Sequence, residues 1–180
     1  LIKAQRNVTL CMDGMKVNGL NFLTTVSRYI MYRTAQFVAH QTTQVYRDAL
    51  GEVLRIYNAG GFHVVKIHCD NEFRALVDPL QDEFQVQINF ANPQEHVPEA
   101  ERNNRIIKER VRATYHRLPY RRLSRTLIKV IVIEAAKKLN FFPPKGGTSP
   151  YYSPRMIMHQ QSLDYNKHCS IAFGSYVQAH

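Results

Sequence analysis

The sequence predicts an α/β fold in which helices cover a central mixed sheet. Three short runs rich in β-branched residues fill the first forty positions, and helix-like and strand-like segments then alternate along the chain. Hydrophobic residues make up 44% of the 180 residues, and nine Phe and ten Tyr supply large core side chains. A chain of this length is long enough for one well-packed domain with a small appendage.

The first forty residues are expected to form a three-stranded antiparallel meander. We predict strands over residues 7–12, 20–27 and 29–38, because these runs have strand composition and only short connections separate them. Asp13 directly follows the first run and is expected to close that strand.

Helices and strands alternate in the rest of the chain. A helix is predicted over residues 42–58, where apolar residues recur at helical spacing and Gly60-Gly61 ends the pattern. The next strand, over residues 62–69, ends at Asp70. The remaining predicted elements are a short helix over 72–80, a strand over 84–90, and two helices over 98–116 and from about 118 onward. This order is typical of a sheet flanked by helices.

The carboxyl-terminal residues differ in composition from the rest. Residues 146–180 are richer in Ser, Tyr, His and Pro, and we expect an extended tail with one late strand over 170–177. The predicted division is therefore a core over residues 1–145 and an extension over residues 146–180.

An acid begins the basic helix predicted over residues 98–116. Asn104, Arg105 and Lys108 follow Glu101 at i+3, i+4 and i+7, so one helical face carries an acid and then a polar and cationic strip. If the strands that end in Asp13 and Asp70 are neighbours and this helix packs across their ends, three carboxylates converge. Such oxygen ligands suit Mg²⁺ or Mn²⁺, and two ions could support phosphoryl transfer.

The charge of the chain is unevenly distributed. Residues 1–101 hold nine Lys and Arg against eleven Asp and Glu, whereas residues 102–180 hold fifteen against three. This asymmetry predicts a polyanionic partner, nucleic acid, whose affinity falls with salt.

Several protein classes are excluded by composition. No apolar run is long enough to span a bilayer, so we expect no membrane partner. Cys11, Cys69 and Cys169 form no Cys-x-x-Cys pair, which argues against a disulfide framework or a zinc site and favours reducing, intracellular surroundings. Because the sequence begins with Leu1 and has no signal-peptide pattern, we interpret it as a piece of a longer product.

Four segments carry a resemblance to a known family. Residues Cys69-Asp70-Asn71-Glu72-Phe73 are similar to the Asp-Asn-Gly-x-Glu-Phe signature, and Asn92-Pro93-Gln94 is similar to a catalytic-loop Pro-Gln. Residues 100–105, Ala-Glu-Arg-Asn-Asn-Arg, match the Ala-Glu-Arg-x-Asn-Arg motif that holds a third acid, and residues 172–177 resemble a Phe-Gly-Cys-x-Ala-Tyr-Val stretch. With the order of elements, nearly the whole chain resembles the catalytic core of retroviral and retrotransposon integrases, most closely the copia type.

This resemblance implies a ribonuclease-H-like fold with a five-stranded mixed sheet, three antiparallel strands followed by two parallel ones, flanked by helices. It also implies that Asp13, Asp70 and Glu101 are the catalytic residues and hold two Mg²⁺ ions, for which Mn²⁺ can substitute. The implied contacts with DNA are Gln94, Asn104, Arg105 and Lys108.

The implied activity is that of a DDE-type polynucleotidyl transferase. Water attacks a phosphodiester near the 3′ end of retrotransposon DNA, and the freed 3′ hydroxyl then attacks target DNA. The expected partners are both DNAs and further copies of the chain, in a dimer or higher multimer. The expected location is a cytoplasmic particle and then the nucleus, for a eukaryotic retrotransposon.

Two other functions remain open on the sequence alone. A ribonuclease-H or transposase-type nuclease shares the arrangement of acids. An inactive, element-derived nucleic-acid-binding module would bind DNA in a salt-dependent way and ignore Mg²⁺. The sequence departs from the family pattern ahead of Glu101, where Glu95-His96-Val97-Pro98 stands in place of a flexible Asn-Gly, and it lacks a glycine after Asn71.

Overall fold

The computed structural model describes residues 6–91, 97–119, 121–169, 171 and 173–175, and its centre is a five-stranded sheet. The strands run in the order β3-β2-β1-β4-β5, with the first three antiparallel and β1, β4 and β5 parallel. Their bounds are β1 Asn7–Val17, β2 Leu20–Ser27, β3 Arg33–Val38, β4 His63–Cys69 and β5 Gln87–Phe90. The predicted five-stranded mixed sheet is thereby confirmed.

The first hairpin is longer than the sequence pattern suggests. β1 continues to Val17 and pairs Val17 with Leu20 across a two-residue turn. Asn18 and Gly19 both adopt positive φ angles, 46° and 77°, as a turn that matches the twist of a hairpin requires. The expectation that Asp13 closes its strand is therefore wrong, because the Asn-Gly turn lets both strands extend past it.

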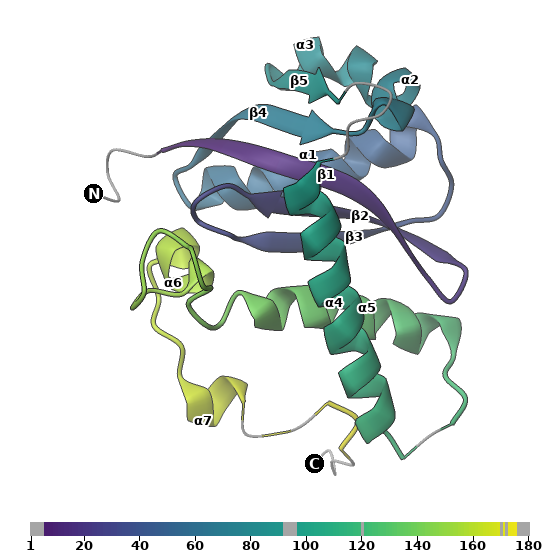
Figure 1. Ribbon diagram of the computed structural model, residues 1–180, viewed down its shortest axis with the longest axis vertical. Coiled ribbons are helices and arrows are strands. Elements are labelled where there is room, and N and C mark those ends of the chain that lie inside the picture. Colours follow the sequence, from purple (N-terminus) through teal and green to yellow (C-terminus); the bar gives the residue numbers. More distant parts are fainter. Residues whose placement is uncertain (1–5, 92–96, 120, 170, 172, 176–180) are drawn as a thin grey trace.

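Alternation along β1 assigns its side chains to two cores. Leu10 and Met12 join the larger core, whereas Cys11 and Met15 belong to clusters on the opposite face. Helix α1, Thr43–Ala59, covers the first face, and helices α4, Pro98–Arg117, and α5, Arg125–Leu139, cover the second, as Figure 1 shows. Asp13 lies in phase with Cys11 and Met15 and thus on the face that α4 covers.

The predicted helix after Leu118 begins later than expected. α5 begins at Arg125, because the Ser124 hydroxyl accepts a hydrogen bond from the Leu127 N–H and caps it. At its other end Asn140 accepts from the Arg33 N–H and donates to the Arg33 carbonyl, both at 2.8 Å. The Asn140 amide thus pairs with both backbone groups of Arg33, as the backbone of an adjacent strand would.

Short helical segments connect β4 to β5 on the face of the sheet that α1 covers. They are η2 Asn71–Phe73, α2 Arg74–Val77, η3 Asp78–Leu80 and α3 Gln81–Phe84. Phe73, Val77 and Leu80 are buried in the larger core, so this connection is packed against the sheet.

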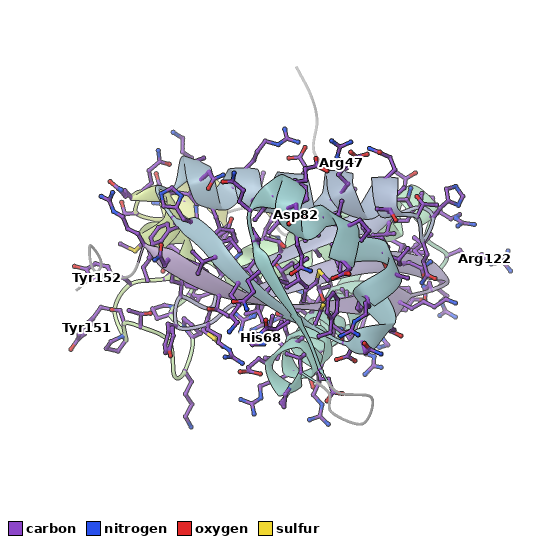
Figure 2. The ribbon with its side chains drawn as sticks, turned by 90° about the horizontal axis from the view of Figure 1, so that it is seen from above. Arg47, His68, Asp82, Arg122, Tyr151 and Tyr152 are labelled. Carbon is purple, nitrogen blue, oxygen red and sulfur yellow. The ribbon has the colours of Figure 1, made fainter. Side chains whose placement is uncertain are left out.

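The carboxyl-terminal segment contains two short helices, α6 Pro154–His159 and α7 Tyr165–His168. Ile157 and Met158 of α6 are buried in the larger core, while Tyr151 and Tyr152 project outward at the end of the molecule opposite Arg122 (Figure 2). Of the late strand predicted over residues 170–177, the described residues 171 and 173–175 form no strand, and the others lie outside the described residues. The boundary between residues 145 and 146 stays a prediction.

No helix in the described part of the chain is long and apolar enough to cross a membrane.

The contact between α1 and α6 depends on a glycine. A Cβ atom on Gly60 would lie 2.6 Å from the Met158 carbonyl oxygen, whereas one on Gly51 would lie 3.9 Å from the Phe84 ring. We predict that Gly60→Ala lowers the free energy of unfolding by about 1–3 kcal/mol, because α6 must move away from α1. Gly51→Ala should instead stabilise the protein by about 1 kcal/mol, since it removes a glycine from within a helix. Urea unfolding of both variants checks this, and equal stability of the two would contradict it.

Candidate active site

Two strand-borne aspartates lie at the same edge of the parallel part of the sheet. β1 and β4 pair in parallel up to Cys11 and His68, and Asp13 and Asp70 each follow two residues later. Their chain positions are thus in step, one within the β1–β2 hairpin and the other at the start of η2. The sequence-based expectation that the two acids are neighbours therefore agrees with the register of the sheet.

A hydrogen-bonded network attaches Asp13 to helix α4. The Asn104 side-chain amide donates to Asp13 Oδ2 at 2.6 Å and to the Gly14 carbonyl at 3.0 Å. The Thr24 hydroxyl, opposite Asp13 on β2, donates to Asn104 Oδ1 at 2.5 Å and lies 3.1 Å from the Asp13 carbonyl oxygen. The Gly14 N–H donates to Asp13 Oδ1 at 2.6 Å. Both carboxylate oxygens of Asp13 are therefore oriented by neighbours.

The surroundings of Asp13 disfavour its negative charge. The pKa of this carboxyl is raised from 3.8 to about 6, chiefly by burial and in smaller part by the negative charges of Asp70, Glu72 and Glu101. The hydrogen bond from the Gly14 N–H opposes the shift. A raised pKa from burial plus several neighbouring acids is typical of a functional site and of a site that a cation would stabilise.

Helix α4 supplies the opposite wall of an open groove beside Asp13. The groove has a volume of about 570 Å³ and is lined by Asp13, Gly14, Glu101, Asn104, Arg105, Lys108, Glu109 and Arg112. Glu101 and Arg105 are exposed, and Lys108 is half-buried. The helix continues from the acid into a cationic strip, so a chain of phosphates could lie along it with a reacting phosphate next to the acids.

The structure brings together most of the predicted site residues. Asp13, Glu101, Asn104, Arg105 and Lys108 share the groove, and Asp70 is close enough to act on the charge of Asp13. Gln94 lies outside the described residues.

Asn104 differs from the prediction in its orientation. Its side chain is only 7% exposed and is bound to Asp13 and Thr24, so it faces the sheet and not the solvent. This geometry favours a role in positioning Asp13 over the predicted contact with DNA.

The chemistry of the donor set fits a hard divalent cation. Mg²⁺ and Mn²⁺ prefer carboxylate oxygens, and Asp13 of β1, Asp70 between β4 and η2, and Glu101 of α4 offer these. In the arrangement described here, however, no three His, Cys, Asp or Glu side chains among the described residues lie close enough together to hold one ion. The three acids would have to move closer together to share a metal.

Thr24 is a member of the site that the sequence pattern does not reveal. Its side chain is fully buried, and it reaches Asn104 only because the hairpin register pairs it with Asp13. A buried threonine within a strand resembles any other β-branched residue until the register is known.

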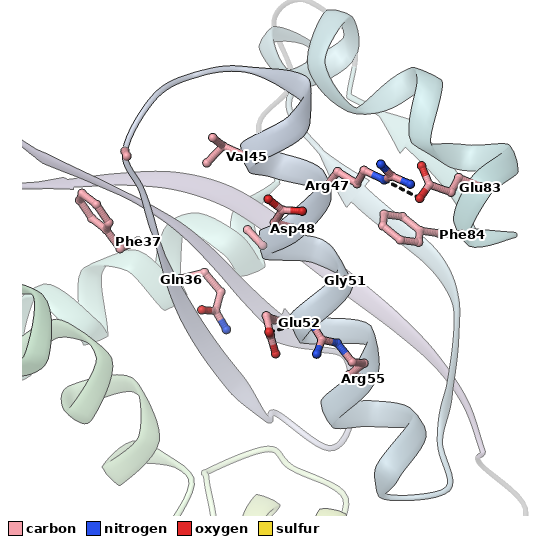
Figure 3. A pocket seen from close by; sticks show the side chains of 12 residues that line it. Gln36, Phe37, Val45, Arg47, Asp48, Gly51, Glu52, Arg55, Glu83 and Phe84 are labelled. Carbon is pink, nitrogen blue, oxygen red and sulfur yellow. Dashed lines mark hydrogen bonds and ion pairs between the residues drawn. The ribbon is translucent and has the colours of Figure 1, made fainter.

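A larger pocket lies away from the acids, between α1, β3 and α3 (Figure 3). Its volume is about 610 Å³, and its charged side chains are paired in part, Arg47 with Glu83 and Arg55 with Glu52, each at 2.6 Å. Of its three carboxylates, Asp48, Glu52 and Glu83, two are thus bound to arginines, which leaves this pocket a weaker candidate for chemistry than the groove beside Asp13.

Comparisons with known proteins support the fold. No protein-family model matches the chain, and no curated protein matches it either. Among solved structures, the catalytic core domain of BIV integrase is similar, with a TM-score of 0.61 and 19% sequence identity over 84% of this chain and 93% of that chain. At this identity the likeness shows the fold alone, a ribonuclease-H-like fold that the chain shares with that domain.

We predict that Asn104→Ala lowers the free energy of unfolding by about 1–3 kcal/mol, because it leaves Asp13 Oδ2 and the Thr24 hydroxyl without their partner. Arg105→Ala, one residue further along α4 and exposed, is the matched control and should stay within about 0.5 kcal/mol of the wild type. Urea unfolding at pH 7 measures both, and similar losses for the two variants would mean that the network contributes little.

The raised pKa of Asp13 predicts that its contribution to the free energy of unfolding depends on pH. The folded chain holds the Asp13 proton up to about pH 6 and the unfolded chain only to about pH 4, so this group favours folding below pH 4 and loses that contribution as the pH rises to about 6. The difference in unfolding free energy, Asp13→Asn minus wild type, should therefore increase by up to about 3 kcal/mol between pH 4 and pH 7. Urea unfolding across this range measures it. A difference that is flat with pH would show that the pKa of Asp13 is not raised.

Proposed function

We propose that this chain is the catalytic core of an integrase, a DDE-type polynucleotidyl transferase that performs metal-dependent phosphoryl transfer on DNA. The observation that carries the proposal is the arrangement of Asp13 and Asp70 at one edge of the sheet with Glu101 across from them on a basic helix. The ribonuclease-H-like fold supports it, since the similar BIV domain is described as the catalytic core of an integrase. The sequence motifs favour a copia-type retrotransposon as the element that encodes this chain.

In this proposal each residue of the groove has a defined task. Asp13, Asp70 and Glu101 would hold two Mg²⁺ or Mn²⁺ ions, which supply activation of the attacking oxygen and stabilisation of the leaving oxygen when bound. Asn104 and Thr24 fix the direction of the Asp13 carboxylate, so that less reorganisation is needed as the reaction proceeds. Arg105 and Lys108 neutralise phosphates on the strand that lies along α4, and Gln94, which precedes the helix in the sequence, contacts DNA.

The same site would serve two reactions. Water first attacks a phosphodiester near the 3′ end of the element DNA and frees a 3′ hydroxyl. That hydroxyl then attacks a phosphodiester of target DNA. The proposal includes assembly of the chain into a dimer or higher multimer, and action inside the cell in a cytoplasmic particle and then in the nucleus.

A second candidate is a DNA-binding module that has lost its chemistry. The spacing of the acids favours it, because no three metal-ligating side chains among the described residues meet in the arrangement seen. This candidate keeps the basic face of α4 and predicts salt-sensitive DNA binding that is indifferent to Mg²⁺. A third candidate is an enzyme of the ribonuclease-H or transposase type, which shares the arrangement of acids, and activity on an RNA/DNA hybrid would favour the nuclease.

We predict that the chain carries out Mn²⁺-dependent disintegration, the reversal of strand transfer on a branched DNA, and that Asp70→Asn or Glu101→Gln lowers the rate at least about 100-fold. Each substitution removes a ligand charge while the shape of the side chain is kept. Asp82→Asn makes the same chemical change on an exposed part of α3, at a position labelled in Figure 2, and should leave the rate unchanged.

The measurement is the rate at which the joined product forms, followed on a sequencing gel. Circular dichroism checks that each variant is folded. A rate for Asp70→Asn within tenfold of the wild type would refute the assignment. Salt-sensitive DNA binding without any product would favour the second candidate, and cleavage of an RNA/DNA hybrid would favour the nuclease.

A further inference from the structure

A second pocket lies against a different stripe of helix α4 from the acid groove. Its volume is about 370 Å³, and it shares no lining residue with the groove. Glu99, Arg102, Asn103 and Ile106, spaced as i, i+3, i+4 and i+7, form its helical wall. The other walls are Cys11 of β1, the end of β2, the turn over residues 28–31, and Arg33 at the start of β3.

The pocket contains buried polar groups that find no hydrogen-bond partner among the described residues. Asn103 is 3% exposed, and neither its amide nitrogen nor its amide oxygen has such a partner in the described part of the chain. Arg33 is 6% exposed, and the same holds for its Nε and for Nε of Arg28. Buried amides and guanidinium groups are nearly always hydrogen-bonded in folded proteins, so this concentration at one pocket indicates that a ligand completes it.

The charge of the pocket is positive. Arg28, Arg33 and Arg102 contribute three guanidinium groups. Glu99, the carboxylate among the described lining residues, is bound to Arg28 at 2.9 Å. Guanidinium groups pair well with phosphate oxygens, because their donors form a planar fork. Arg102 is exposed on α4, where it can meet a phosphate at the edge of the pocket.

The remaining walls are largely apolar and suit an apolar group such as an aromatic ring. They are formed by Val26, Met31, Ile106 and the buried Cys11, with the ring of Tyr29 68% exposed beside them. The Asn103 amide offers one donor and one acceptor side by side, a pattern that pairs with the edge of a nucleobase and of adenine in particular. An apolar slot, a free amide and several arginines together match a base, its hydrogen-bonding edge and its phosphate.

We propose that this pocket binds one unpaired nucleotide of a DNA strand, with the base between the apolar walls, its edge at Asn103 and its phosphate at Arg28 and Arg102. The proposal rests on the proposed function insofar as the strand is the DNA that the acid groove acts on. It specifies a feature of the substrate, namely an unstacked nucleotide near the reacting end. A blunt duplex has no such nucleotide. Base stacking and arginine contacts of this kind are how unpaired strands are commonly bound.

The test uses the full chain in EDTA, so that binding is measured apart from any metal-dependent chemistry. Adenosine 5′-monophosphate is the free nucleotide, and adenosine and inorganic phosphate each supply half of it. A duplex with unpaired adenines at one 5′ end and the same duplex with blunt ends separate a nucleotide held in a strand from a free one. Isothermal titration calorimetry gives the affinity for each probe.

Two variants remove different parts of the pocket. Asn103→Leu keeps the volume of the side chain but deletes the amide, and it should fold at least as stably as the wild type, because the amide has no partner to lose among the described residues. Arg102→Gln removes an exposed charge from the edge of the pocket. Lys138→Gln is the matched control, since it removes one exposed positive charge from α5 away from the pocket.

The expected result is that the unpaired end raises duplex affinity at least tenfold, and that Asn103→Leu and Arg102→Gln abolish this gain while Lys138→Gln keeps it. Unchanged binding by Asn103→Leu would overturn the proposal, as would inorganic phosphate competing as well as the nucleotide. If free nucleotide binds but the unpaired end does not raise the affinity for the duplex, the claim that the bound nucleotide belongs to a DNA strand is overturned. If the wild-type chain shows no disintegration activity but binds the unpaired end as expected, the proposed function is refuted and the assignment of this pocket stands.

Discussion

The contact between the Asn104 amide and the Asp13 carboxylate holds the candidate site together, because it joins helix α4 to the central strand of the sheet. Thr24 extends the network into β2, so three elements that are far apart in sequence meet at one carboxylate. Through this contact the first turns of α4 are held against the hairpin, and Val97 and Ala100 pack on Cys11 and Val26 beside it. The direction in which Glu101, Arg105 and Lys108 extend from α4 follows from how the helix is fixed.

Holding a negative charge at Asp13 carries an electrostatic cost. Asp13 is half-buried near Asp70, Glu72 and Glu101, and its pKa rises to about 6. A protein that needed only a stable fold would gain by an apolar residue here. Retention of several acids in one place is physically reasonable if a divalent cation and a phosphate chain offset their charges, and the cationic strip of α4 begins next to them.

Much of the fold follows from sequence patterns, and the differences have local causes. Strand-like composition and turn residues located the five strands, although β3 and β5 begin later than predicted, and helical spacing located α1 and α4. The spacing also put Glu101, Asn104 and Lys108 beside one groove. Asp13 was expected at a strand end, but the backbone angles of Asn18 and Gly19 let the hairpin continue. Helical spacing could not tell that Asn104 turns inward, since that depends on the register opposite Asp13. Helix α6 was missed, although Ser153 followed by Pro154 is a recognisable start of a helix.

The central claim is that Asp13, Asp70 and Glu101 share a divalent metal. The most direct test is a crystal structure of the chain grown or soaked in Mn²⁺, with anomalous diffraction used to locate the ions. The account predicts Mn²⁺ bound by oxygens of all three carboxylates, with Asp13 still bound to Asn104. Manganese absent from the groove at millimolar concentration, or bound there without Asp70 and Glu101, would contradict it.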